Sequence, residues 1–172
     1  MPCLQKGRAF LEASGVAGSV LYPTMGLAMA HIKVPKWVAV MARCYDDYLY
    51  GEYLQQEPRR LWGVALLPIQ DVDAAAEELE HCVKDLKMVG GVIPAAGLPK
   101  GLGHPMYDPL YETAVRLNVP LAAHGGSSAG LGLDFYDSFV KILVMEHAVA
   151  QQIHFTSFLL DGAFAQVEDG LS

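Results

Sequence analysis

Val119-Pro120-Leu121-Ala122-Ala123-His124-Gly125-Gly126-Ser127-Ser128 is the stretch of this chain most indicative of its architecture. An apolar run ends in a histidine, and a loop of small residues follows it. Buried parallel strands have continuous apolar sequences, and ligands bind beyond their carboxyl ends. The stretch therefore predicts a buried parallel strand that delivers the His124 side chain to the mouth of an α/β sheet.

Composition indicates one folded domain that spans residues 1–172. Hydrophobic residues make up 52% of the chain and charged residues 18%, which argues against disorder. The formal net charge of −7 disfavours nucleic acid and anionic membranes as partners, because both are bound chiefly through Lys and Arg. No apolar run reaches the roughly 18 residues that a membrane span requires.

The cysteines and the first residues favour a cytoplasmic protein. Cys3, Cys44 and Cys82 are odd in number and far apart, so they fit neither a disulfide framework nor a zinc-binding pair. We expect reduced thiols, as in the cytoplasm. Residues 1–8 lack the long apolar segment of a secretory signal.

Short apolar runs alternate with helical patterns along the chain. We expect strands at residues 16–24, 61–69, 89–95 and 119–124, and helices at 35–54, 71–87, 108–117 and 135–164, the last in two pieces. Residues 25–33 and 97–107 are predicted to be loops. Strands that alternate with helices imply right-handed crossovers and a parallel sheet. Two architectures fit this order, an open doubly wound sheet and part of a (β/α)-barrel.

The predicted helices carry recognisable faces and caps. In 35–54, one helical face is formed by Trp37, Met41, Cys44, Tyr45 and Tyr48, and we expect its aromatic residues in the core or at a subunit contact. In 71–87, Asp71 is the expected N-cap and the glutamates Glu77, Glu78 and Glu80 the solvated side. Asp108 is the expected N-cap of 108–117.

Several motifs, taken in order, resemble one known family. They are Leu21-Tyr22-Pro23-Thr24 with Ala42-Arg43-Cys44-Tyr45-Asp46-Asp47-Tyr48, then Arg60-Leu61-Trp62-Gly63-Val64-Ala65-Leu66-Leu67-Pro68-Ile69-Gln70-Asp71, then Pro105-Met106-Tyr107-Asp108-Pro109-Leu110-Tyr111, and then Pro120-Leu121-Ala122-Ala123-His124-Gly125-Gly126-Ser127. Together they resemble the amidohydrolase-related family, in the branch that contains aminocarboxymuconate-semialdehyde decarboxylase and related decarboxylases and hydrolases. The likeness covers about residues 8–164. It implies a (β/α)₈ TIM barrel with its active site at the carboxyl ends of the strands.

The resemblance also implies a divalent metal, most commonly zinc. In the family, its ligands are a His-x-His pair after the first strand, a His after the fifth and an Asp after the eighth, and a His after the sixth acts in catalysis. His124 matches the fifth-strand ligand, but no two of the six histidines here are separated by one residue. The other positions have no match either. We therefore expect strands two to five of a barrel, and a fragment of a metal-dependent hydrolase or decarboxylase that binds metal weakly and is inactive alone.

Further site residues follow from the resemblance and from spacing. The resemblance implies a small carboxylated substrate, for which Tyr22, Thr24 and Ser127 are the expected binding residues. His147 and His154 lie seven residues apart, so they share one face of a continuous helix. They fit either a polar helix face or a relay or metal pair.

Four strands taken from a barrel leave two open edges, predicted at residues 16–24 and 119–124. Apolar side chains of the barrel interior would also be exposed to water. We therefore expect a homodimer that hides these edges, or an open sheet with repacked helices. Two other functions fit the sequence: a non-catalytic α/β binding or interaction module, and a flavodoxin-like module with a ligand at its strand ends.

Overall fold

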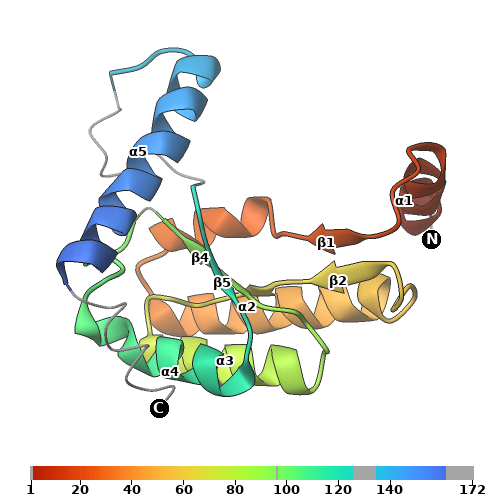
Figure 1. The fold of residues 1–172 in the computed structure, drawn as a ribbon, viewed down its shortest axis with the longest axis horizontal. Helices are drawn as coiled ribbons and strands as arrows, with labels where there is room; N and C mark the ends of the chain where they lie inside the picture. The colour runs from red at the N-terminus through yellow and green to blue at the C-terminus, as the bar shows by residue number, and fades with distance from the viewer. Residues whose placement is uncertain (1, 96, 126–134, 162–172) are drawn as a thin grey trace.

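Strands and helices alternate along the computed structural model, which describes residues 2–95, 97–125 and 135–161 (Figure 1). The elements in chain order are α1 (Pro2–Ala13), β1 (Ser19–Leu21), the 3₁₀ helix η1 (Met25–His31), α2 (Pro35–Leu49), the π-helical turn η2 (Tyr50–Leu54), β2 (Leu61–Gly63), β3 (Ala65–Leu66), α3 (Val72–Lys84), β4 (Gly91–Pro94), the 3₁₀ turn η3 (Pro105–Tyr107), α4 (Asp108–Leu117), β5 (Leu121–His124) and α5 (Phe139–Leu160). The predicted order of strands and helices is confirmed.

All strand pairs are parallel and follow the chain order. β1 pairs with β2, and β3–β4–β5 form a second ladder. Val64 separates β2 from β3, and its N–H donates to Leu21 O at 3.2 Å, so the two ladders belong to one layer. Since every strand runs the same way, all carboxyl ends meet at one rim of the sheet. β1 and β5 are the edge strands, as predicted.

The two faces of the sheet are covered differently. Leu61, Ala65 and Leu67 alternate toward the helices and join one core cluster with residues of α3 and α4. α2, α3 and α4 lie side by side on this face (Figure 1). On the other face, Val20 is opposite Trp62 in the register, and the two side chains are 44% and 38% exposed. The open part of this face, at β1 and β2, corresponds to the interior of a barrel, because TIM-barrel helices cover only the outside, whereas Leu66 of β3 and Val92 of β4 are buried.

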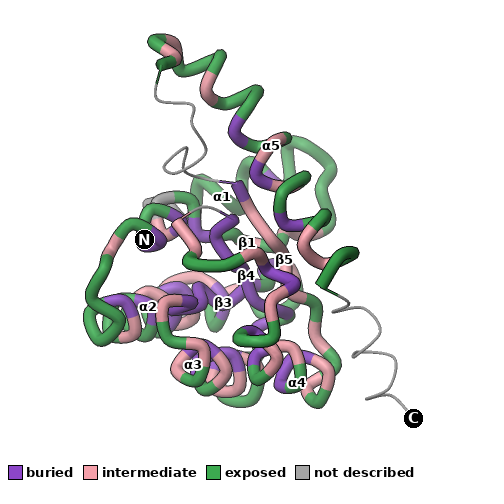
Figure 2. Tube along the Cα trace, turned by 90° about the vertical axis from the view of Figure 1, so that its left-hand side faces the viewer, coloured by how far each residue is buried: buried purple, intermediate pink, exposed green. Residues whose placement is uncertain are grey.

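α2 buries a different face from the predicted one. Val38 and Ala42 are fully buried, whereas Trp37 is 68% exposed and Tyr48 is 55% exposed. Buried and exposed stretches alternate along α2 (Figure 2). Trp37 and Tyr48 therefore do not lie in the core, whereas Tyr45 of the same stripe is partly buried against both core clusters, as expected. The sequence contains two stripes at helical spacing, and the stripe with the smaller residues allows α2 to approach the sheet closely. Whether the aromatic stripe makes a subunit contact stays a prediction.

Of the two predicted N-cap residues, Asp71 is confirmed and Asp108 is wrong. Asp71 is the N-cap of α3, and its side chain accepts a hydrogen bond from Ala74 N at 3.1 Å. Asp108 is instead the first residue of α4, which has Tyr107 at its N-cap. The reason is that η3 leads directly into α4, and His104 caps η3 by accepting from Met106 N at 3.1 Å.

The last helix and the segment after β1 also differ from expectation. α5 is one continuous helix of 22 residues rather than two pieces. Residues 25–31 form the 3₁₀ helix η1 rather than a loop, and Leu27 and Met29 of this helix pack on Leu66 and Val92 in a second core cluster. Within the described ranges, we find no helix that combines the length and the apolar character a bilayer span needs.

Candidate functional site

The carboxyl rim of the sheet gathers the sequence-predicted site residues that the structure describes. His124 is the last residue of β5 and is half-buried, and Tyr22 follows β1 directly. Their ring centroids lie 6.2 Å apart with an interplanar angle of 41°. The Nδ1 atom of His124 is in contact with Gly125 O. The sheet therefore brings Tyr22 and His124 together from its two edge strands.

The structure gives less information about Thr24 and Ser127, the other two residues predicted to bind substrate. Thr24 is exposed and lies directly before η1, with no capping hydrogen bond from its side chain. Ser127 lies outside the described residues. The roles of His124, Tyr22, Thr24 and Ser127 in binding therefore stay predictions.

α5 adds an imidazole that the sequence did not connect with this rim. His147 is exposed, and its ring lies edge-on to that of His124 with the centroids 5.9 Å apart. Of the two alternatives for His147 and His154, the relay or metal pair is not formed. His154 is instead buried, where its Nδ1 accepts from Leu102 N at 3.2 Å and its Nε2 donates to Ala95 O at 2.6 Å. Burial lowers the pKa of His154, so this ring is neutral and anchors α5.

A second polar cluster lies between α2, α3 and β3. Among the described residues, Asp46, Glu78 and Cys82 form the one group of three metal-capable side chains whose donor atoms all lie within 4.8 Å of one another. Asp46 accepts from Leu66 N with both carboxyl oxygens, at 3.0 and 3.2 Å. Glu78 pairs with Arg43 Nε at 2.7 Å. The prediction that Glu78 is solvated is thus wrong, because this ion pair compensates its burial.

This cluster stabilises the fold. Burial, which dominates, raises the pKa of Asp46 to about 8 although the bonds from Leu66 N and Cys82 oppose the shift. Burial likewise raises the pKa of the Cys82 thiol, so the sulfur stays protonated and can donate to Asp46 and Glu78. Every carboxyl group here has a partner, and the cluster ties two helices to a strand. Sequence reasoning missed it, although Asp46 lies at helical spacing from Val38 and Ala42 on the buried stripe.

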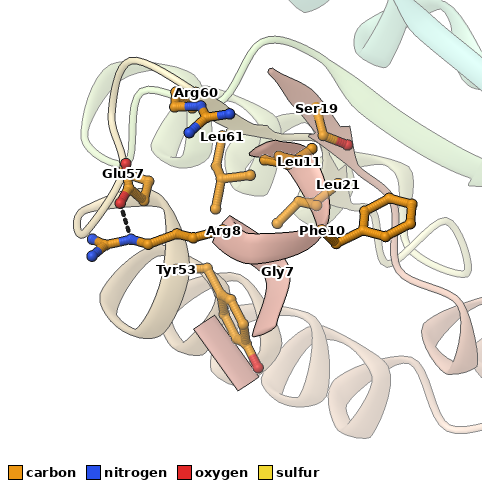
Figure 3. A pocket seen from close by; sticks show the side chains of 10 residues that line it. All are labelled: Gly7, Arg8, Phe10, Leu11, Ser19, Leu21, Tyr53, Glu57, Arg60 and Leu61. Carbon is orange, nitrogen blue, oxygen red and sulfur yellow. Dashed lines mark ion pairs between the residues drawn. The ribbon is translucent and has the colours of Figure 1, made fainter. Parts of the chain in front are cut away.

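A cavity of about 240 Å³ opens at the other end of the sheet (Figure 3). It lies between α1, η2 and the amino ends of β1 and β2, and its walls are mainly apolar, with Phe10, Leu11 and Leu61 among them. An ion pair between Arg8 and Glu57 closes one side. In (β/α)-barrels the amino ends of the strands serve stability rather than chemistry, so this cavity is not the candidate site.

Comparison with known proteins places these observations in context. A protein-family model described as Amidohydrolase matches residues 19–169. The gamma-resorcylate decarboxylase of Polaromonas sp. strain JS666 is 31% identical over 131 residues, which are 72% of this chain and 40% of that enzyme. This chain therefore spans less than half the length of that relative.

Solved structures show the same relation. The 2,6-dihydroxybenzoate decarboxylase from Rhizobium superposes with a TM-score of 0.78 at 25% identity, over 92% of this chain and 51% of that structure. The dihydroxybenzoic acid decarboxylase from Polaromonas sp. JS666, solved with bound manganese and the inhibitor 2-nitroresorcinol, gives a TM-score of 0.81 at 24% identity, over 95% and 51%. The described sheet is therefore an open section of a TIM barrel, and the predicted fold class is confirmed.

Proposed function

Because this chain belongs to the amidohydrolase family, we propose that it forms part of the active site of a metal-dependent decarboxylase for small carboxylated aromatic compounds. The observation that carries the proposal is the position of His124, at the carboxyl rim of a section of parallel barrel. Barrel enzymes place their catalytic residues at this rim. The decarboxylases named above supply the substrate class.

The residues at the rim have the donor chemistry of a divalent metal. His124 and His147 offer imidazole nitrogens, and their ring centroids lie 5.9 Å apart. Imidazole and carboxylate are the ligands that zinc and its neighbours take. When bound, such an ion would polarise a substrate carboxylate. Manganese in the Polaromonas neighbour makes Mn²⁺ a second ion to test beside Zn²⁺.

The substrate would pack against the aromatic ring of Tyr22 at the carboxyl rim. Tyr22 is 44% exposed beside His124, so its ring offers a flat apolar surface for an aromatic acid. Thr24 and Ser127 are proposed to contact the polar groups of the substrate. The chain alone is expected to be inactive, because a catalytic zinc site uses three protein ligands and the family's other ligand positions have no match here.

Titration of the ¹⁵N-labelled chain with 2,6-dihydroxybenzoate in the presence of Zn²⁺ tests this function. We expect amide shifts at Tyr22, Thr24 and His124, no release of CO₂, and loss of these shifts in His124→Ala. His81→Ala, which removes an imidazole from the distant helix α3, is the matched control and should behave as wild type. Equal shifts in wild type and His124→Ala would contradict the proposal and favour a non-catalytic binding module.

A further inference from the structure

The cavity at the amino ends of β1 and β2 has walls from three parts of the fold. Gly7 and Leu11, four residues apart, share one face of α1. Leu21 of β1 and Leu61 of β2 face them across the cavity, and Tyr53 of η2 completes the lining (Figure 3). A ligand here would therefore contact α1, η2 and the sheet at once.

The cavity is large enough for a substituted aromatic ring. Its volume is about 240 Å³, and its walls are mainly apolar. An apolar cavity of roughly 150 Å³ in a protein binds benzene. The larger volume here leaves room for a ring with substituents, whose binding would be driven by the apolar area removed from water.

The charged groups around the cavity already neutralise one another. Arg8 forms an ion pair with Glu57. Arg60 lies 3.5 Å from Glu12 and donates to two backbone oxygens before β1, each at 3.2 Å. An anion would thus meet no unpaired cation among the described residues of the lining, and burial of an uncompensated charge is costly. The cavity therefore favours a neutral ligand.

The wall offers one hydroxyl group that can recognise a polar substituent. Ser19 is half-buried and lies on the same face of β1 as Leu21. We find no hydrogen bond to the Ser19 side chain among the residues that the structure describes. A serine hydroxyl can donate as well as accept, so it suits the hydroxyl group of a phenol.

We propose that this cavity binds a neutral phenol, with the ring among the leucine side chains and the hydroxyl group bonded to Ser19. The site goes beyond the proposed function and does not depend on it, because it lies at the opposite end of the strands from His124. A ligand that binds only the folded chain stabilises it. Bound phenol would thus hold α1 against the sheet.

Titration of the full chain, labelled with ¹³C at its leucine methyl groups, with 4-ethylphenol tests the site. We expect shifts at Leu11, Leu21 and Leu61, with a Kd below about 1 mM. The corresponding anion, 4-ethylbenzoate, should bind at least tenfold more weakly at these leucines. Ser19→Ala should weaken 4-ethylphenol about threefold or more but leave ethylbenzene, which has no hydroxyl group, within twofold.

Gly7 allows a variant that fills the cavity. A Cβ atom added at Gly7 would meet nothing within 4 Å, although Gly7 is part of the lining. Gly7→Leu should therefore occupy the space without a clash and weaken 4-ethylphenol at least tenfold. Gly51→Leu is the matched control, because an added Cβ there also meets nothing within 4 Å but Gly51 lies outside the lining. It should stay within twofold of wild type, and circular dichroism verifies that both variants are folded.

The outcomes separate this cavity from the carboxyl rim. Binding of 4-ethylphenol that is unchanged in Gly7→Leu, or 4-ethylbenzoate bound as tightly as 4-ethylphenol, overturns the proposal. If Tyr22→Ala abolishes binding while Gly7→Leu leaves it within twofold, the phenol occupies the rim. That result would contradict the cavity site and leave the proposed function standing.

Discussion

The protonation of Asp46 changes when the chain folds. Its pKa rises from 3.8 to about 8, chiefly through burial and further through Glu78 and Asp47. Between roughly pH 4 and pH 8, folded Asp46 keeps a proton that the unfolded chain has lost. The folded state then binds more protons, so the Asp46 contribution to stability falls as pH rises through this window. The Asp46 carboxyl group also accepts hydrogen bonds from Leu66 N and from the Cys82 thiol. It contributes, after burial, to the raised pKa of Tyr45.

Asp46→Asn is expected to remove this pH dependence. The amide resembles the protonated carboxyl, can accept from Leu66 N, and carries no charge at any pH. Relative to wild type, D46N should gain roughly 4 kcal/mol of unfolding free energy between pH 5 and pH 8.5. Urea unfolding at several pH values measures the difference. A constant difference between the two proteins at all pH values would show that Asp46 is ionised in the folded chain.

At the scale of single elements, the buried face of α2 can be tested by a pair of truncations. Val38 is fully buried, so Val38→Ala should lower the free energy of unfolding by about 2 kcal/mol through lost burial and a residual cavity. Trp37 is 68% exposed, and Trp37→Ala should change it by less than about 0.5 kcal/mol. Urea unfolding followed by circular dichroism compares them. If Trp37→Ala were the more destabilising of the two, the aromatic stripe would be the buried face of α2.

The N-cap of α3 gives a second element-scale prediction. Asp71→Ala removes the acceptor of the Ala74 N–H, one of the donors that a helix start cannot satisfy itself. We expect a loss of about 1 kcal/mol in unfolding free energy. Glu77→Ala, in the exposed middle of the same helix, is the control and should be nearly neutral. Equal effects of the two substitutions would mean that the cap contributes nothing.

The sequence was informative about elements and less so about their faces. A strand was predictable at residues 61–69, because they form an apolar run ended by turn residues, but its division into β2 and β3 at Val64 was not. The face of α2 could not be predicted, since two stripes have helical spacing and tertiary packing selects between them. Likewise α5 is apolar on all sides, so its periodicity does not indicate which side meets the strands. The position of His124 was predictable, but its approach to His147 was not.

At the scale of the whole molecule, the two edges of the sheet are not equally open. Pro120 O and His124 O accept hydrogen bonds from β4, so Ala123 O points to the outer edge of β5. Gln151 of α5 occupies that carbonyl. On β1, Ser19 N and Leu21 O bond toward β2, so the polar groups of Val20 point outward. β1 is therefore the edge that favours pairing with another chain.

We expect two copies of this chain to associate through β1. Pairing would satisfy outward backbone groups and cover the exposed Val20 and Trp62 side chains, which lie opposite each other in the register. Light scattering should then give about 37 kDa, twice the 18.6 kDa of one chain. Val20→Lys should restore a monomer, because closure would bury an unpaired charge, whereas Val40→Lys on the exposed side of α2 should remain a dimer. A wild-type mass of one chain at tens of micromolar would rule this assembly out. The sheet face that carries Val20 would then be exposed to water in a monomer.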